Sequence, residues 1–282
     1  MSLGGSSAEG AEAVWQRAAR ARERVDRELA LVRKYEVLAQ RTGSAVYFRI
    51  GHIHRTSASR HEVTARLLES YARRSAEWAD TGGRPPLFMT GVAEACGSGS
   101  AAVTLVDSER NQIASAASDG PSCAAQELEY VLGEGPARDA VRESRTVVAG
   151  GSGLTRRWPG YGPAVVGLGI GQLVAVPLET GDGCIGALAA FGVGGDTRSA
   201  ATVVQVADSL TRNVFLGVDA VPGLFGGIDY RAEVHQAAGM VAVQLGCRIP
   251  DALELVKVRA FVDSRPLGDV ARDIVHGRLQ LG

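Results

Sequence analysis

The sequence predicts an α+β protein built from N-terminal helices, an antiparallel sheet flanked by helices, and a C-terminal three-helix bundle. Three observations support this fold class. Residues 11–80 are rich in helix formers, the middle of the chain holds five strand-sized apolar runs bounded by turn residues, and three short segments near the end have helical periodicity. Stretches of helix- and strand-breaking residues at 81–86 and 222–227 divide these parts. The expected domains are therefore 1–86, 87–221 and 222–282.

Composition limits the function classes. The net charge of −1 provides no overall attraction to nucleic acid or to an acidic membrane, so a polyanion site would have to be a local patch. No apolar run has the length of a membrane span, and the N-terminus lacks the features of a signal peptide. The four cysteines are far apart and form no CxxC pair, which is typical of reduced thiols rather than of disulfides or zinc ligands. We expect a cytoplasmic protein without a membrane partner.

The N-terminal part predicts two amphipathic helices. In the first, Val25, Leu29 and Val32 form a narrow apolar stripe. After breaks at Gly43 and Gly51, a second helix is expected over residues 58–80. Such stripes need a partner, which is either the other helix or a second chain, so this region is compatible with a coiled coil and favours a homodimer. The spacing of His52, His54 and His61 matches no compact metal motif, and no metal site is expected.

The middle part predicts an antiparallel sheet with flanking helices. The strand candidates are residues 101–106, 112–118, 145–150, 171–178 and 184–193, and hairpin turns are expected at 107–112 and 179–183. Helices are expected at about 124–132, 136–143 and 198–219. Hairpins mixed with helices favour an α+β arrangement over strict βα alternation.

This part resembles a GAF domain. The resemblance is carried by "LGEGPARDAVRESRTVVAG" (132–150) and by residues 156–191, which include an "RWP" turn and two strands with "AVPL" and "GALAAF". It implies a domain that holds a small ligand or mediates dimerisation. Relatives often have a cysteine directly after GEGP; here that position is Ala137, so no thiol chemistry is implied. Either a small molecule or side chains could fill the pocket of this domain.

No constellation in the sequence indicates catalysis. Histidine is absent between residues 62 and 234, so Ser122, Cys123 and Asp139 have no histidine nearby in sequence that would complete a nucleophile pair. No phosphate-binding loop precedes a helix. We therefore expect neither an enzyme nor a cofactor.

The C-terminal part of the sequence predicts three helices. Each has roughly 12–16 residues, and an isolated helix of that length is not stable in water. In the first helix Val234, Ala237, Ala238, Val241 and Leu245 share one face, and Gly246 ends it. The second helix begins near Pro250 and the third near Leu267. Their inward faces are expected at Ala252, Val256 and Ala260, and at Leu267, Val270, Ala271 and Ile274.

Residues 230–281 resemble an ANTAR domain, the three-helix RNA-binding module of antiterminators. "VHQAAGMVAVQLG", "DALELVKVRAF" and "RPLGDVARDIVHGRL" carry the resemblance. It implies binding to paired hairpin loops of leader transcripts, usually by a dimer. The implied RNA-binding residues are Gln236, Ala237, Ala238, Gly239, Lys257, Arg259, Arg265 and Arg272. Relatives commonly hold a lysine where this chain has Ala238, so a lysine introduced there is expected to strengthen RNA binding.

The combined expectation is a transcription antitermination regulator in which a GAF-like sensor domain controls an ANTAR-like domain. The helix at 198–219 is expected to carry the signal between them. The alternative is a protein-interaction regulator of the same architecture without RNA binding. Two features favour this alternative, namely Ala238 at the lysine position and the zero net charge of residues 226–282.

Overall fold

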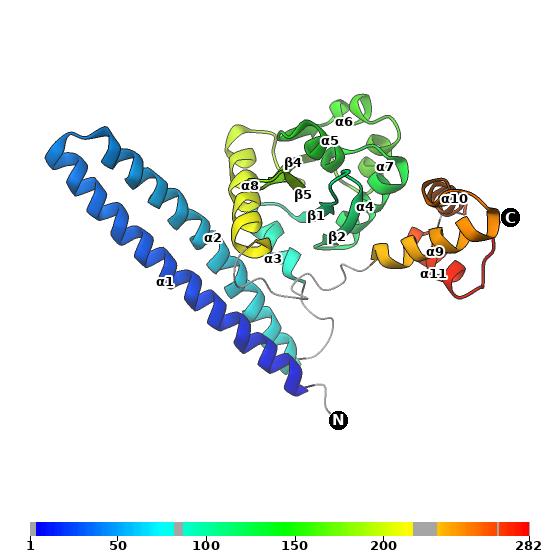
Figure 1. Ribbon diagram of the computed structural model, residues 1–282, viewed down its shortest axis with the longest axis horizontal. Helices are drawn as coiled ribbons and strands as arrows, with labels where there is room; N and C mark the ends of the chain where they lie inside the picture. Colours follow the sequence, from blue (N-terminus) through cyan, green and yellow to red (C-terminus); the bar gives the residue numbers. More distant parts are fainter. Residues whose placement is uncertain (1–3, 82–86, 217–229, 264, 282) are drawn as a thin grey trace.

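The computed structural model describes residues 4–81, 87–216, 230–263 and 265–281. It confirms the α+β fold class. A long helical hairpin lies at one end of the molecule, a five-stranded sheet with helices on both faces occupies the centre, and three short helices lie at the other end (Figure 1). The predicted breaker stretches fall largely within residues 82–86 and 217–229, outside the described residues.

The hairpin consists of α1 (Gly4–Thr42) and α2 (Ala45–Thr81), joined at Gly43 in a left-handed conformation. Val25 and Val32 of the predicted stripe are buried against α2, whereas Leu29 stays partly exposed. Arg22 reinforces the pairing with ion pairs to Glu62 and Glu69 at 2.5 and 2.7 Å. Two of the three stripe residues, Val25 and Val32, are therefore covered by the other helix of the same chain, and Leu29 is not.

The predicted break at Gly51 is wrong, because α2 begins at Ala45 and continues through Gly51. A glycine inside a helix costs only about 1 kcal/mol relative to alanine. Packing against α1 outweighs this cost, and a Cβ on Gly51 would make only an ordinary contact, 3.7 Å from that of Tyr35.

The sheet has the order β2-β1-β5-β4-β3 and is antiparallel throughout. Its strands are β1 (Ser100–Val106), β2 (Gln112–Ala117), β3 (Val147–Gly150), β4 (Gln172–Glu179) and β5 (Cys184–Phe191). All five predicted strands and both predicted hairpin turns are thus confirmed to within a few residues. Alternation along β5 sends Leu188 to one face and Ala187 and Ala189 to the other.

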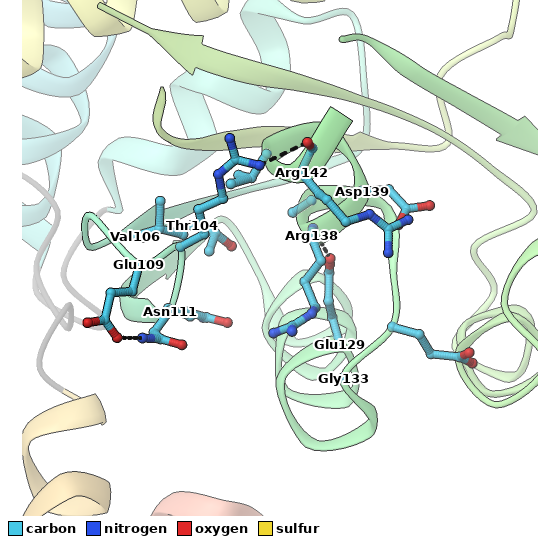
Figure 2. Close-up of a pocket in the computed structure, with 14 residues that line it drawn as sticks. Thr104, Val106, Glu109, Asn111, Glu129, Gly133, Arg138, Asp139 and Arg142 are labelled. Carbon is cyan, nitrogen blue, oxygen red and sulfur yellow. Dashed lines mark hydrogen bonds and ion pairs between the residues drawn. The ribbon is translucent and has the colours of Figure 1, made fainter. Parts of the chain in front are cut away.

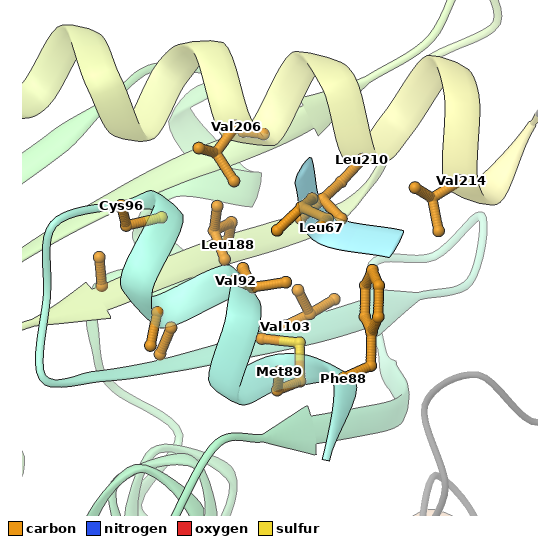
Figure 3. Close-up of a cluster of buried hydrophobic side chains, with 14 of the residues drawn as sticks. Leu67, Phe88, Met89, Val92, Cys96, Val103, Leu188, Val206, Leu210 and Val214 are labelled. Carbon is orange, nitrogen blue, oxygen red and sulfur yellow. The ribbon is translucent and has the colours of Figure 1, made fainter. Parts of the chain in front are cut away.

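Helices α3 (Phe88–Ala95) and α8 (Thr197–Ser209) cover the first face of the sheet, and α2 packs against both helices. Figure 3 shows Phe88, Met89 and Val92 of α3 in the core below α8. Leu67 of α2 belongs to the same hydrophobic cluster. Helix α8 continues as a π-helix, η1 (Leu210–Phe215), within the predicted helical segment. This core attaches the hairpin to the middle domain.

The other face carries α4 (Gly120–Leu132), α5 (Pro136–Glu143), α6 (Ser152–Arg157) and α7 (Tyr161–Gly167). Helices α4 and α5 were predicted. Helices α3, α6 and α7 were not, because each has eight residues or fewer and shows too little periodicity. A tightly packed apolar core, including Leu154, Trp158 and Tyr161, fills the space between the sheet and these helices.

The C-terminal bundle comprises α9 (Tyr230–Leu245), α10 (Ile249–Val262) and α11 (Leu267–Val275). The inward positions predicted for α10 and α11 are all buried, and Gly246 ends α9 with a positive φ of 63°. The predicted inward position of Leu245 is wrong, since it is 41% exposed. Leu245 is the last residue of α9, where the bundle no longer covers the helix. Helix α11 also ends earlier than predicted, just before Gly277, whose φ is 70°.

Candidate functional site

A cavity of about 280 Å³ lies in the middle domain between the β1–β2 hairpin and helices α4 and α5 (Figure 2). Thr104 and Gln112 reach it from the strands, Glu129 from α4, and Arg138 and Asp139 from α5. The sequence analysis did not single out Glu129. The sequence gives little signal for it, because its helix face also carries Ser122 and Gln126, and Glu127 lies two positions before it.

Glu129 is the most unusual group in the cavity wall. Its side chain is almost completely buried, and Oε1 accepts a hydrogen bond of 2.5 Å from the backbone N–H of Arg138. Among the described residues Oε2 has no partner. Burial raises the pKa of Glu129 to about 8, although the Arg138 hydrogen bond acts in the opposite direction. At neutral pH the carboxyl is therefore largely protonated and offers both a donor and an acceptor.

The chain makes room for this carboxyl at Gly135. The glycine has a φ of +154°, and a Cβ there would lie only 2.6 Å from Cδ of Glu129. The GEGP turn therefore does more than open α5, because its second glycine permits the close approach of a buried acid.

Further buried polar atoms near Glu129 also lack partners within the described part of the chain. They include Nε2 of Gln112, which lines the cavity, Nε2 of Gln126, and the hydroxyl of Tyr161. Gln126 does bind Thr104 through its Oε1. Buried polar groups in native proteins are nearly always hydrogen-bonded. Glu129 and Gln112 both line the cavity and each has one such atom, so the cavity offers hydrogen-bonding groups to a small polar molecule.

The rim of the cavity is charged and internally braced. Asp139 accepts hydrogen bonds from Arg142 at 2.8 Å, from Arg157 at 2.9 Å and from the indole of Trp158 at 3.1 Å. Arg110 donates to the backbone oxygen of Arg142 at 2.9 Å. Asp139 is thus a structural anchor of α5 and α6. At the rim, the exposed Arg138 and Arg110 form no ion pair among the described residues.

The side of α4 away from the sheet contacts the C-terminal bundle. Tyr130 belongs to the bundle's hydrophobic core, and Nζ of Lys257 lies 4.4 Å from the centre of its ring. Glu127 accepts a hydrogen bond from the backbone N–H of Leu267 at the start of α11. Helix α4 therefore presents Glu129 to the cavity and the neighbouring Tyr130 to the bundle.

The structure separates the eight candidate RNA-binding residues into three groups. On α9, Gln236 is exposed and Gly239 half-buried, but Ala237 and Ala238 are fully buried. Both alanines thus lie on the inward face predicted from periodicity, where the bundle's packing uses their small side chains, and their role in RNA binding stays a prediction. A lysine at position 238 would meet packed protein rather than RNA.

The four cations of α10 and α11 are engaged within the protein. Arg259 pairs with Asp263 at 2.7 Å, Arg265 with Asp273 at 2.6 Å, and Arg272 with Asp269 at 3.0 Å. Lys257 pairs with Glu254 at 2.9 Å, and its side chain is only 11% exposed. The exposed ion pairs are individually weak and could be exchanged for phosphate contacts, whereas Lys257 must first leave Tyr130.

No family model and no curated protein matches the chain. Among solved structures, the chain is similar to the crystal structure of the GAF domain from Acinetobacter phosphoenolpyruvate-protein phosphotransferase, at 14% sequence identity and a TM-score of 0.33. The match covers 52% of this chain and 90% of that one. The resemblance of residues 230–281 to the ANTAR family stays a prediction.

Two further expectations concern metals and membranes. Within the described residues, no group of three or more His, Cys, Asp and Glu side chains is arranged to hold a metal ion. His54 instead binds Glu28 at 2.7 Å and stacks on Tyr35. Among the described helices, none combines the length and the apolar character that crossing a membrane requires.

Proposed function

We propose that this chain is a non-enzymatic, cytoplasmic regulator in which the middle domain senses a small polar molecule and controls RNA binding by the C-terminal bundle. The regulated process is transcription antitermination, as the resemblance of the bundle to ANTAR domains implies. One observation supports the link between sensing and output. Helix α4 holds the cavity acid Glu129 and the bundle contact Tyr130 at adjacent positions.

The signal then has a short path. A ligand that binds Glu129 and Gln112 exchanges hydrogen bonds on one side of α4, and Tyr130 and Glu127 on its other side hold Lys257 and the start of α11. The bundle contacts the middle domain through α4 and β2. The earlier expectation that the helix at 198–219 carries the signal stays a prediction, since part of that segment lies outside the described residues.

The test is RNA binding by the full chain. The probe is an RNA with two adjacent hairpins, compared at low salt with a single-stranded RNA of the same composition. Arg265→Ala and Arg272→Ala should each weaken binding and lower the salt slope by about one unit. Arg248→Ala is the matched control, because Arg248 is an exposed bundle arginine that pairs with Asp251 and is not a predicted contact.

The alternative function is a protein-interaction regulator of the same architecture. It is favoured by the internal pairing of the bundle's arginines and by the burial of Ala238. Absence of binding to the two-hairpin RNA at low salt would exclude RNA binding by the wild-type chain and leave this alternative. If Arg248→Ala and Arg265→Ala reduced the RNA affinity equally, the binding would be nonspecific and electrostatic.

A further inference from the structure

Helix α10 has a second apolar face that the bundle does not use. Ala252, Val256 and Ala260 form its buried face, whereas Leu255, Val258 and Val262 lie on a different side and are 43%, 57% and 71% exposed. An amphipathic helix in a small bundle normally carries polar residues there. The contacts within the described part of the chain therefore leave this apolar face uncovered.

Further exposed hydrophobic side chains lie on α10 and at the end of α9. Other large hydrophobic side chains near it in the sequence are also exposed, namely Val243, Leu245, Ile249 and Phe261. Scattered exposed hydrophobics are ordinary, but a concentration of seven within residues 243–262 is typical of an interaction surface. Aliphatic side chains offer nothing to a phosphate backbone, which is recognised by cations and hydrogen-bond donors. The face is therefore suited to a protein partner.

The spacing of the face points to a helix as that partner. Leu255, Val258 and Val262 follow one another at intervals of three and four residues, which is the a, d, a pattern of a coiled-coil seam. In that frame Glu254 occupies the g position before Leu255, and Arg259 occupies the e position after Val258. Both lie at the edge of the apolar face.

The charges at these edges are complementary to a second copy of the same helix. In a parallel pair, the g residue of one helix faces the e residue of the next heptad on the other helix, five positions further along. Glu254 and Arg259 have this separation, so a symmetric pair would form the Glu254–Arg259 contact twice. Their present partners are near in sequence, since Glu254 pairs with Lys257 and Arg259 with Asp263, and Glu254 and Arg259 are themselves largely or partly exposed.

We propose that the exposed face of α10 binds α10 of a second copy of this chain, forming a parallel, in-register helix pair. Leu255, Val258 and Val262 form the seam, and Glu254 and Arg259 fix its orientation. The surface is accessible because the hairpin α1–α2 lies at the opposite end of the molecule (Figure 1). The contact with α4 is retained, since Lys257 lies on another side of α10.

The first experiment measures the oligomeric state of the full chain by sedimentation velocity over a dilution series. Wild type is expected to dimerise, and Val258→Glu should weaken the dimer by about tenfold or more because it buries a charge at the centre of the interface. Val204→Glu is the matched control, as Val204 is an exposed valine on α8, distant from α10 in sequence. A monomeric wild type, or a dimer equally stable in Val258→Glu, would overturn the proposal.

The second experiment tests orientation. Glu254→Arg and Arg259→Glu should each weaken the dimer, because each single change sets like charges opposite one another, and the double variant should restore it. In addition, Val258→Cys should form an intermolecular disulfide under mild oxidation, well above the background of Val204→Cys and wild type. The parallel pair would be excluded if the double variant dimerised even more weakly than either single variant and Val258→Cys formed no intermolecular disulfide. RNA binding is not needed for either readout, so this inference and the proposed function fail separately.

Discussion

Nζ of Lys257 lies 4.4 Å from the centre of the Tyr130 ring, which connects the C-terminal bundle to helix α4 of the middle domain. The lysine is one of only two in the chain, and the resemblance to an RNA-binding module implies that it binds RNA. Here an aromatic ring covers it instead. The same contact therefore docks the bundle and withholds one of its candidate RNA-binding cations.

Removing the ring should free the bundle. In Tyr130→Ala, the loss of the cation–π contact, about 1 kcal/mol, and of the buried ring area should undock α10, so that hydrogen exchange in α9–α11 rises. If the bundle binds RNA, the affinity should rise as well, since Lys257 becomes accessible. Tyr130→Phe is the control, because it keeps the ring and should retain wild-type protection. Equal exchange in Tyr130→Ala and wild type would contradict the docking role.

Glu129 should make stability depend on pH. Its pKa is raised to about 8 in the folded chain, so between the ordinary glutamate value of 4.5 and pH 8 the folded state holds a proton that the unfolded state has lost. This group's contribution therefore falls as pH rises through that window, by up to about 1.4 kcal/mol per pH unit. Urea unfolding of wild type and Glu129→Gln at pH 5.5 and 8 measures this pH-dependent contribution to the free energy of unfolding. Glu129→Gln should lose less stability between the two pH values, and identical pH profiles would refute the assignment.

The GEGP turn offers a matched pair of glycines. Gly133 and Gly135 both have positive φ, but a Cβ at Gly133 meets no atom within 4 Å, whereas one at Gly135 would overlap the Glu129 carboxyl. Gly133→Ala should cost about 1 kcal/mol of backbone strain. Gly135→Ala should cost more, in total about 2–4 kcal/mol, because Glu129 must also move. Equal unfolding free energies would show that Glu129 is not held against the turn.

A substitution at position 238 tests whether this residue lies in the core of the bundle or on its surface. Ala238 is completely buried, so Ala238→Lys should destabilise the bundle by several kcal/mol, on the order expected for burying an unpaired charge. Gln236→Lys, at an exposed position two residues earlier, should be tolerated. Thermal unfolding of both variants followed by circular dichroism measures the difference. A stable Ala238→Lys variant with tighter RNA binding would restore the expectation from the sequence.

The hairpin can be tested with two valines of α1. Val32 is buried against α2 and Val37 is exposed. Val32→Asp should lower the hairpin's stability by about 3 kcal/mol or more, since it buries an unpaired carboxylate, whereas Val37→Asp should change it by less than about 0.5 kcal/mol. Hydrogen exchange of residues 12–78 reports on both variants. Comparable exchange in the two would mean that the stripe is not buried within the chain.

The sequence by itself determined the elements whose signal is local. Strand-sized apolar runs bounded by turn residues located all five strands, and helical periodicity located the bundle helices with inward faces such as Ala252, Val256 and Ala260. Breakers were less reliable. Gly43 ended a helix, but Gly51 did not, because the cost of a single glycine is smaller than the packing free energy of two long helices.

Only the tertiary structure decided which residues form the sites. Glu129 drew no attention in the sequence, since its importance comes from burial beside Gly135 and from a hydrogen bond across nine positions. Ala238 and Lys257 were assigned to a ligand surface by resemblance, yet the fold buries the first in the bundle and covers the second with Tyr130. Periodicity reports which face of a helix is apolar. It cannot report which distant segment packs against that face, because contacts between distant segments depend on how the whole chain folds in three dimensions.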